Sequence, residues 1–110
     1  MAEAIIPVSG ASLLRLVEAI ERDRALACAH AAEAERASYQ PSEARECAAL
    51  ASAAADRASY AERALFASTI ARALLSPEYK ARARRAAQSA RYLAERARAS
   101  AYNPSREGRS

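Results

Sequence analysis

The sequence predicts an all-α fold, a three-helix antiparallel up-down bundle that follows an extended N-terminal leader. Alanine, arginine, glutamate and leucine dominate, and all four are strong helix formers. Gly10 and Gly108 lie outside every periodic segment, and Pro41 and Pro77 separate the periodic segments from one another. A chain of 110 residues is long enough for one domain and too short for two. We therefore expect residues 1–110 to form one helical-bundle domain.

The first helix is expected over about residues 11–39. It follows the glycine at position 10, with Ser9 or Ser12 as its N-cap, because a serine oxygen accepts hydrogen bonds from the first free N–H groups. Pro41 ends the segment, since the residue before a proline resists the helical conformation.

The second and third helices are expected over about residues 42–75 and 77–101, and the second would be roughly 50 Å long. Ser76 is the predicted N-cap of the third helix, with Pro77 in the first position and Glu78 facing the positive end of the helix dipole. Such short connections make neighbouring helices antiparallel. Facing residue numbers should then add up to about 81 for the first two helices and about 152 for the last two.

Two terminal segments flank the predicted bundle. The leader over residues 1–10 carries Ile5, Ile6 and Val8, which we expect to cover a groove on the bundle or on a neighbouring copy. Asn103 and Pro104 end the third helix, and residues 103–110 form the tail.

The inward-facing positions divide the predicted bundle into two different ends. At 100° per residue, one end gathers bulky side chains: Leu13, Leu16, Val17, Ile20, Leu65, Phe66, Ile70, Leu74 and Tyr79. The other end gathers small ones, with Cys47 and Leu50 beside them: Ala27, Ala31, Ala34, Ala54, Ala58, Ala94 and Ala97. Because protein interiors are densely packed, either the helices close up there, or a second chain fills the space, or a ligand does. Buried alanine removes little apolar surface from water, so we expect a homo-oligomer built through these faces.

His30 is the one candidate ligand for a cofactor, and Cys28, two residues before it, points about 160° away on a helix and cannot share a metal with it. A neutral imidazole on a bundle wall could bind a haem iron or another transition metal, with alanines leaving room for the macrocycle. The alternative is a residue at the flank, since His30 lies about 60° from the centre of the inward stripe. Cys28 and Cys47 form no CxxC motif and are offset along the hairpin, so we expect two reduced, buried thiols without a disulfide and a cytoplasmic protein.

Positive charge is concentrated in the last third of the chain. The net charge is +4, and the third helix carries Lys80, Arg84, Arg91 and Arg98 in one column that we expect on its outer face. Such a column could follow the phosphates of a nucleic acid or meet the acidic first half of a neighbouring copy. Arg24 falls on the inward face of the first helix, near Arg57, and Arg72 falls on that of the second. Because a buried arginine needs a partner, we expect these side chains to extend to solvent at the bundle edges and to pair with acids there; an anion site is the alternative. The expected partners are Glu62, Asp23 and Glu35.

Two segments resemble helices of known protein classes. ALACAHAAEA and ARECAALASAAAD are similar to helices of the cysteine-rich four-helix copper-storage proteins, whose CxxxC turns bind Cu(I). Only Cys28 and Cys47 remain here, so the resemblance does not carry the copper site over. SPEYKARARRAA and the absence of interior glycine resemble computationally designed bundles, whereas the free cysteines and the single lysine, Lys80, favour a natural chain.

The sequence offers no catalytic constellation. It lacks a Ser-His-Asp order, a glycine-rich phosphate loop and paired inward carboxylates, so we do not expect an enzyme. No apolar run reaches the roughly 18–20 residues that cross a bilayer, and we expect a soluble chain with no membrane partner. The predicted function is a non-enzymatic interaction or assembly module, with nucleic-acid binding and small-molecule or haem binding as the alternatives.

Overall fold

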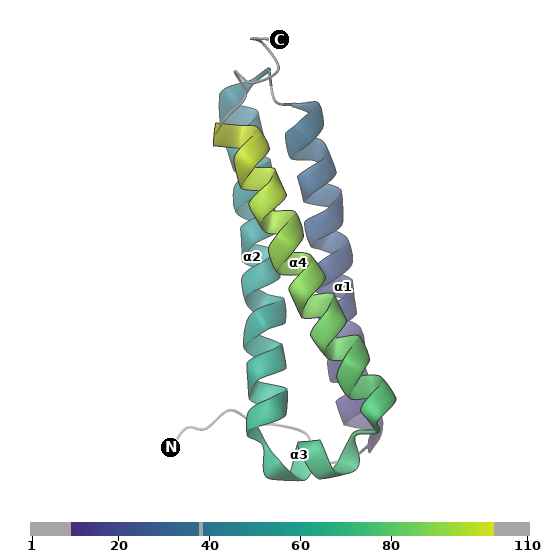
Figure 1. Cartoon of the computed structure of the whole chain (residues 1–110). Helices are drawn as coiled ribbons and strands as arrows, with labels where there is room; N and C mark the ends of the chain where they lie inside the picture. The colour runs from purple at the N-terminus through teal and green to yellow at the C-terminus, as the bar shows by residue number, and fades with distance from the viewer. Residues whose placement is uncertain (1–9, 38, 103–110) are drawn as a thin grey trace.

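The computed structural model describes residues 10–37 and 39–102, and every element in them is a helix. The order is α1 (Gly10–Arg36), α2 (Pro41–Ala67), α3 (Thr69–Leu74) and α4 (Pro77–Tyr102). The three long helices pack against one another in all three pairs, and α3 crosses the end of the bundle between α2 and α4 (Figure 1). The all-helical bundle is confirmed, but the described chain has four helices and not three.

The extra helix arises from a break at Ser68. The helix predicted over residues 42–75 ends at Ala67, where Ser68 turns extended (φ −85°, ψ 121°) and its Oγ accepts a hydrogen bond from Ala71 N over 3.1 Å. Serine competes in this way with the helical backbone, and the β-branched Thr69 that follows has a lower helix propensity. Arg72 Nη1 then donates to the Phe66 carbonyl over 2.6 Å, so a carbonyl near the end of α2 keeps a partner.

The bounds of α1 and the start of α2 differ from the predicted ones. Helix α1 begins at Gly10, which places Ser12 within the first turn and not at the N-cap, and it ends at Arg36. Helix α2 begins with Pro41 in the first turn, after Gln40, which provides no side-chain cap. Proline suits this position because its missing N–H would be unpaired there anyway. The predicted leader before Gly10, with Ser9, and the tail from residue 103 lie outside the described residues.

The start of α4 agrees with the prediction. Pro77 opens the helix, Glu78 lies in its first turn, and Ser76 Oγ accepts a hydrogen bond from Tyr79 N over 3.2 Å. The third long helix is therefore specified locally by its capping sequence.

The bulky end of the core is smaller than expected. Its largest fully buried side chains are Leu13, Val17, Ile20 and Leu65; Leu16, Phe66 and Tyr79 pack against them and are partly buried. Ile70 and Leu74 were assigned to this core wrongly: they are 56% and 52% exposed. The break at Ser68 is the reason, because a helix that turns across the end of the bundle no longer presents these positions to α1 and α4.

The other end of the bundle is closed by alanine. The seven alanines predicted for it are only 0–4% exposed: Ala27, Ala31, Ala34, Ala54, Ala58, Ala94 and Ala97. They belong to the two core clusters. Small side chains allow helix axes to approach closely, and here the chain's own three helices cover these alanines. A second chain therefore has no access to them, and any face for it lies elsewhere on the surface.

Close packing at the alanine end predicts a cost for any larger side chain. Ala97→Leu should lower the free energy of unfolding by about 1–3 kcal/mol, because extra methylene groups in a packed core force side chains and backbone apart. Ala99→Leu, on the exposed side of the same helix, is the matched control and should change stability little. Urea unfolding monitored by circular dichroism measures both, and equal stabilities for the two variants would contradict a closed interior.

Candidate interaction surfaces

The seam between α1 and α2 is fixed by two polar contacts. Arg57 donates from Nε and Nη2 to Asp23 Oδ1 over 3.2 and 3.1 Å. Nearer the connection, the Cys47 thiol donates to Glu33 Oε1 over 3.9 Å. In both pairs the residue numbers add up to 80, close to the predicted 81, so the antiparallel register of the hairpin follows from its short connection.

Two exposed leucines lie on this seam. Leu26 comes three residues after Asp23, and Leu50 comes three residues after Cys47, so each shares a helix face with a seam contact. They are 44% and 51% exposed. Leu50 was assigned to the core wrongly, and Leu26 had no predicted role. The sequence signal that could have found both leucines is their spacing of three residues from Asp23 and Cys47, each of which belongs to a seam contact.

Exposed alanines complete an apolar area around the leucines. Ala29 follows Leu26 by three residues and Ala53 follows Leu50 by three, and both alanines are exposed. With the register of the hairpin, all four residues fall at nearly the same height of the bundle. Below, Leu26, Ala29, Leu50 and Ala53 are called the central patch.

Opposite charges lie on the two sides of the central patch. Arg15 and Arg22 are exposed toward the start of α1. Toward the α1–α2 connection stand the exposed Glu33, Glu43 and Glu46. Burial raises the pKa of the Cys47 thiol, the three carboxylates raise that pKa further, and the exposed Arg36 lowers it; the acids outnumber this arginine around the thiol. The central patch with these five charged residues is called the α1–α2 face.

His30 borders the acidic side of this face. Its Nδ1 is buried, lies 3.7 Å from Glu33 Oε1 and has no hydrogen-bond partner among the described residues. Ala31 and Ala34, which were expected to leave room for a macrocycle, are packed in the core instead. Within the described residues, no three His, Cys, Asp or Glu side chains form a metal-binding group. Both cysteines are free, and Cys28 is exposed, which corrects its assignment to the interior.

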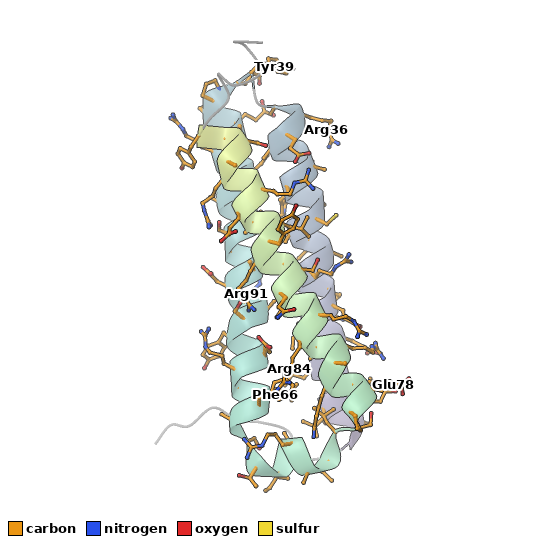
Figure 2. All side chains as sticks on the ribbon, viewed as in Figure 1. Arg36, Tyr39, Phe66, Glu78, Arg84 and Arg91 are labelled. Carbon is orange, nitrogen blue, oxygen red and sulfur yellow. The ribbon has the colours of Figure 1, made fainter. Side chains whose placement is uncertain are left out.

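The predicted arginine column of the third helix lies along α2. Figure 2 places Arg84 next to Phe66 and Arg91 on the side of α4 toward α2. The Arg84 guanidinium lies 4.3 Å from the centroid of the Phe66 ring. Arg91 Nη1 donates to Ser59 Oγ over 2.9 Å and Arg98 Nη1 donates to Ser52 Oγ over 2.9 Å. Arg84, Arg91 and Arg98 are exposed, as expected, but the column follows the α2–α4 seam and does not point directly away from the bundle; Lys80, which begins it, is partly buried.

The seam between α1 and α4 holds a second set of arginines. Arg82 binds Glu21 with two hydrogen bonds of 2.9 and 2.7 Å, and Arg96 pairs with Glu35. This contact with Arg82 lowers the pKa of Glu21 against the effect of burial, and Glu21 in turn raises the pKa of Arg82. Each charge therefore stabilises the other.

Arg24, Arg57 and Arg72 are exposed, as expected for arginines at the edges of the bundle. Arg57 does pair with Asp23, one of the expected acids. Arg24 donates from Nε to Ser89 Oγ over 3.2 Å, and Arg72 donates to the Phe66 carbonyl. Long side chains reach out of the seams to solvent, so an arginine near the inward stripe needs no buried acid.

The fold and these surfaces define an all-helical bundle with charged seams. No protein-family model, no curated protein and no solved structure matches the chain. Within residues 10–37 and 39–102, no helix has the length and apolar character that crossing a membrane requires.

The Glu21–Arg82 pair predicts a pH dependence of stability. Arg82 holds the folded-state pKa of Glu21 below its ordinary value of 4.5, so the charged carboxylate stabilises the fold above that pH. This stabilisation is lost as the pH falls below 4.5 through the lowered folded-state pKa. Wild type should therefore exceed Glu21→Gln in unfolding free energy at neutral pH, and the difference should shrink toward about pH 3.

Urea unfolding at a series of pH values measures this difference. Glu95→Gln is the control, because Glu95 is exposed and forms no ion pair within the described chain. A difference between wild type and Glu21→Gln that stays constant with pH would contradict the assigned role of the pair.

Proposed function

We propose that this chain is a non-enzymatic, self-associating helical module that forms an antiparallel dimer through its α1–α2 face. The observation that carries the proposal is the order of residues along this face: mainly basic, then apolar, then mainly acidic. Glu18 beside the basic residues and Arg36 beside the acidic ones reduce these charges but do not reverse them. A two-fold axis brings the same patch of both copies together. The order therefore places the basic side of each copy on the acidic side of the other.

The spacing of the charges supports an axis through the central patch. Arg22 lies four residues before Leu26, and Glu46 lies four residues before Leu50 on the antiparallel helix. The two charges thus stand about one helical turn from the patch, on opposite sides of it. In the dimer Arg22 of each copy faces Glu46 of the other, and charge pairing of this kind fixes register and speeds association.

The size of the face is sufficient for a stable contact. A helix of 27 residues is about 40 Å long at 1.5 Å per residue. Two helices packed side by side are about 18 Å wide when their axes are 8–10 Å apart. The face then offers roughly 700 Å² per copy, close to the roughly 800 Å² per partner of a standard interface.

The other surfaces support their alternatives less well. The alanine faces named for self-association are covered by the chain's own helices. The column of Lys80, Arg84, Arg91 and Arg98 is the alternative for nucleic acid, but its three arginines already contact Phe66, Ser59 and Ser52 on α2. Each guanidinium would have to share or break its contact with α2 in order to bind a phosphate, which weakens binding.

Replacing either leucine of the central patch with a charged residue tests the proposal. Leu26→Glu and Leu50→Glu should each weaken the dimer by more than about tenfold, because burying a leucine contributes about 1.5–3 kcal/mol and 1.4 kcal/mol is a factor of ten. Leu74→Glu is the matched control: Leu74 is 52% exposed but lies on α3. Light scattering and sedimentation over a concentration series give the dissociation constants.

A charge exchange tests the antiparallel arrangement. Arg22→Glu should weaken the dimer, and adding Glu46→Arg should restore it, because the exchanged charges again face each other across the axis. A wild-type chain that stays monomeric at all accessible concentrations would contradict the proposal. So would a dimer that Leu26→Glu and Leu50→Glu leave intact.

A further inference from the structure

We propose that the groove between α1 and α4 is a binding site for a nucleotide, with its phosphate between Arg24 and Arg85 and its base on Tyr92. The groove has a volume of about 660 Å³ and is lined by both helices. It lies on the α1–α4 seam, away from the α1–α2 face, so this inference is independent of the proposed dimer.

The groove carries positive charge that its own residues do not neutralise. Three arginines line it, Arg24, Arg82 and Arg85, together with a single carboxylate, Glu21. Glu21 is held by Arg82 in a two-fold hydrogen-bonded pair, so these two charges cancel. Arg24 and Arg85 remain. An anion can bind to these two arginines without breaking the Glu21–Arg82 ion pair.

The two remaining guanidinium groups have donors to offer. Arg24 uses only Nε, in its hydrogen bond to Ser89 Oγ. Arg85 forms no hydrogen bond or ion pair within the described residues. Both arginines also act on the same carboxylate, since each contributes to the lowered pKa of Glu21. Both also line the same groove beside that carboxylate, and arginine binds a phosphate group through paired N–H donors.

Tyr92 adds an aromatic surface to the same groove. Its ring is exposed, with 60% of the residue accessible, and it lines the groove beside Ser89 and Gln88. The Arg96 guanidinium lies 6.0 Å from the ring centroid and so supports the ring from one side. An exposed tyrosine next to unpaired cations is the arrangement on which a nucleotide base stacks while its phosphate is bound. Ser89 and Gln88 provide hydroxyl and amide groups for polar contacts with the ligand.

The dimensions of the groove fit one nucleotide. Small-molecule sites commonly have volumes of about 300–1,000 Å³, and this groove falls within that range. Because it is open to solvent, its electrostatic attraction is screened by salt. We therefore expect binding that weakens as the salt concentration rises.

An NMR titration of the full chain tests the site. Adenosine triphosphate should shift the side-chain signals of Arg24, Arg85 and Tyr92. The double variant Arg24→Gln/Arg85→Gln should bind about tenfold more weakly, since 1.4 kcal/mol is a factor of ten. Arg63→Gln is the control: Arg63 is exposed on α2 and lies outside the groove. Circular dichroism verifies that the variants fold.

Two further ligands separate the parts of the proposal. Inorganic triphosphate should bind more weakly than adenosine triphosphate to wild type, and Tyr92→Ala should remove that difference. A single-stranded oligoadenylate distinguishes a strand from a free nucleotide: binding to it that exceeds binding of adenosine triphosphate assigns the site to nucleic acid.

Three results would overturn the inference. The first is no shift at the three side chains with either adenine ligand. The second is an affinity that Arg24→Gln/Arg85→Gln reduces no more than Arg63→Gln does. The third is equal binding of inorganic triphosphate and adenosine triphosphate, which would leave no role for the base.

Discussion

The close approach of three long helices through alanine is the constraint on which the rest of the structure depends. Alanine side chains remove little apolar surface from water, so packing alone defines the seams weakly. Among the described residues, ion pairs cross all three seams: Arg57–Asp23 between α1 and α2, Arg91–Glu62 between α2 and α4, and both Arg82–Glu21 and Arg96–Glu35 between α1 and α4. Exposed pairs of this kind contribute little stability individually. Their role is to select one register among helices whose alanine faces would fit in several.

A narrow alanine interior also determines what the surface can do. Within the described chain, large apolar side chains are fully buried only toward the α3 end, at Leu13, Val17, Ile20 and Leu65, whereas Leu26 and Leu50, beside the alanines, are exposed. The arginines reach outward along the seams, as Arg84 does over Phe66 (Figure 2). Apolar and cationic side chains thus lie together on the surface, at the α1–α2 face and in the α1–α4 groove. Both proposed binding functions use these surface side chains.

The sequence predicts those parts of the fold that depend on local chemistry. Pro77 with Ser76 marks the start of α4, and the short connection sets the hairpin register to within one residue. The break at Ser68 was missed because it is stabilised partly by Arg72, which binds the Phe66 carbonyl after the turn has formed. The alanine stripe of α4 orients the helix toward the core, since seven of its alanines are buried. The stripe does not tell which neighbouring helix each of its two flanks meets, so the contact of Arg91 with Ser59 on α2 was missed.

The distance between labels at equal positions of two copies tests the central claim most directly. With both cysteines replaced by serine, a spin label at Ala29, in the central patch, should lie close to its counterpart in the dimer. A label at Ala11 should lie about 50 Å from its own counterpart, since about 17 residues at 1.5 Å each separate it from the axis. Double electron–electron resonance measures both distances. A short distance at both positions would show a parallel dimer and contradict the account, as would the absence of any intermolecular distance.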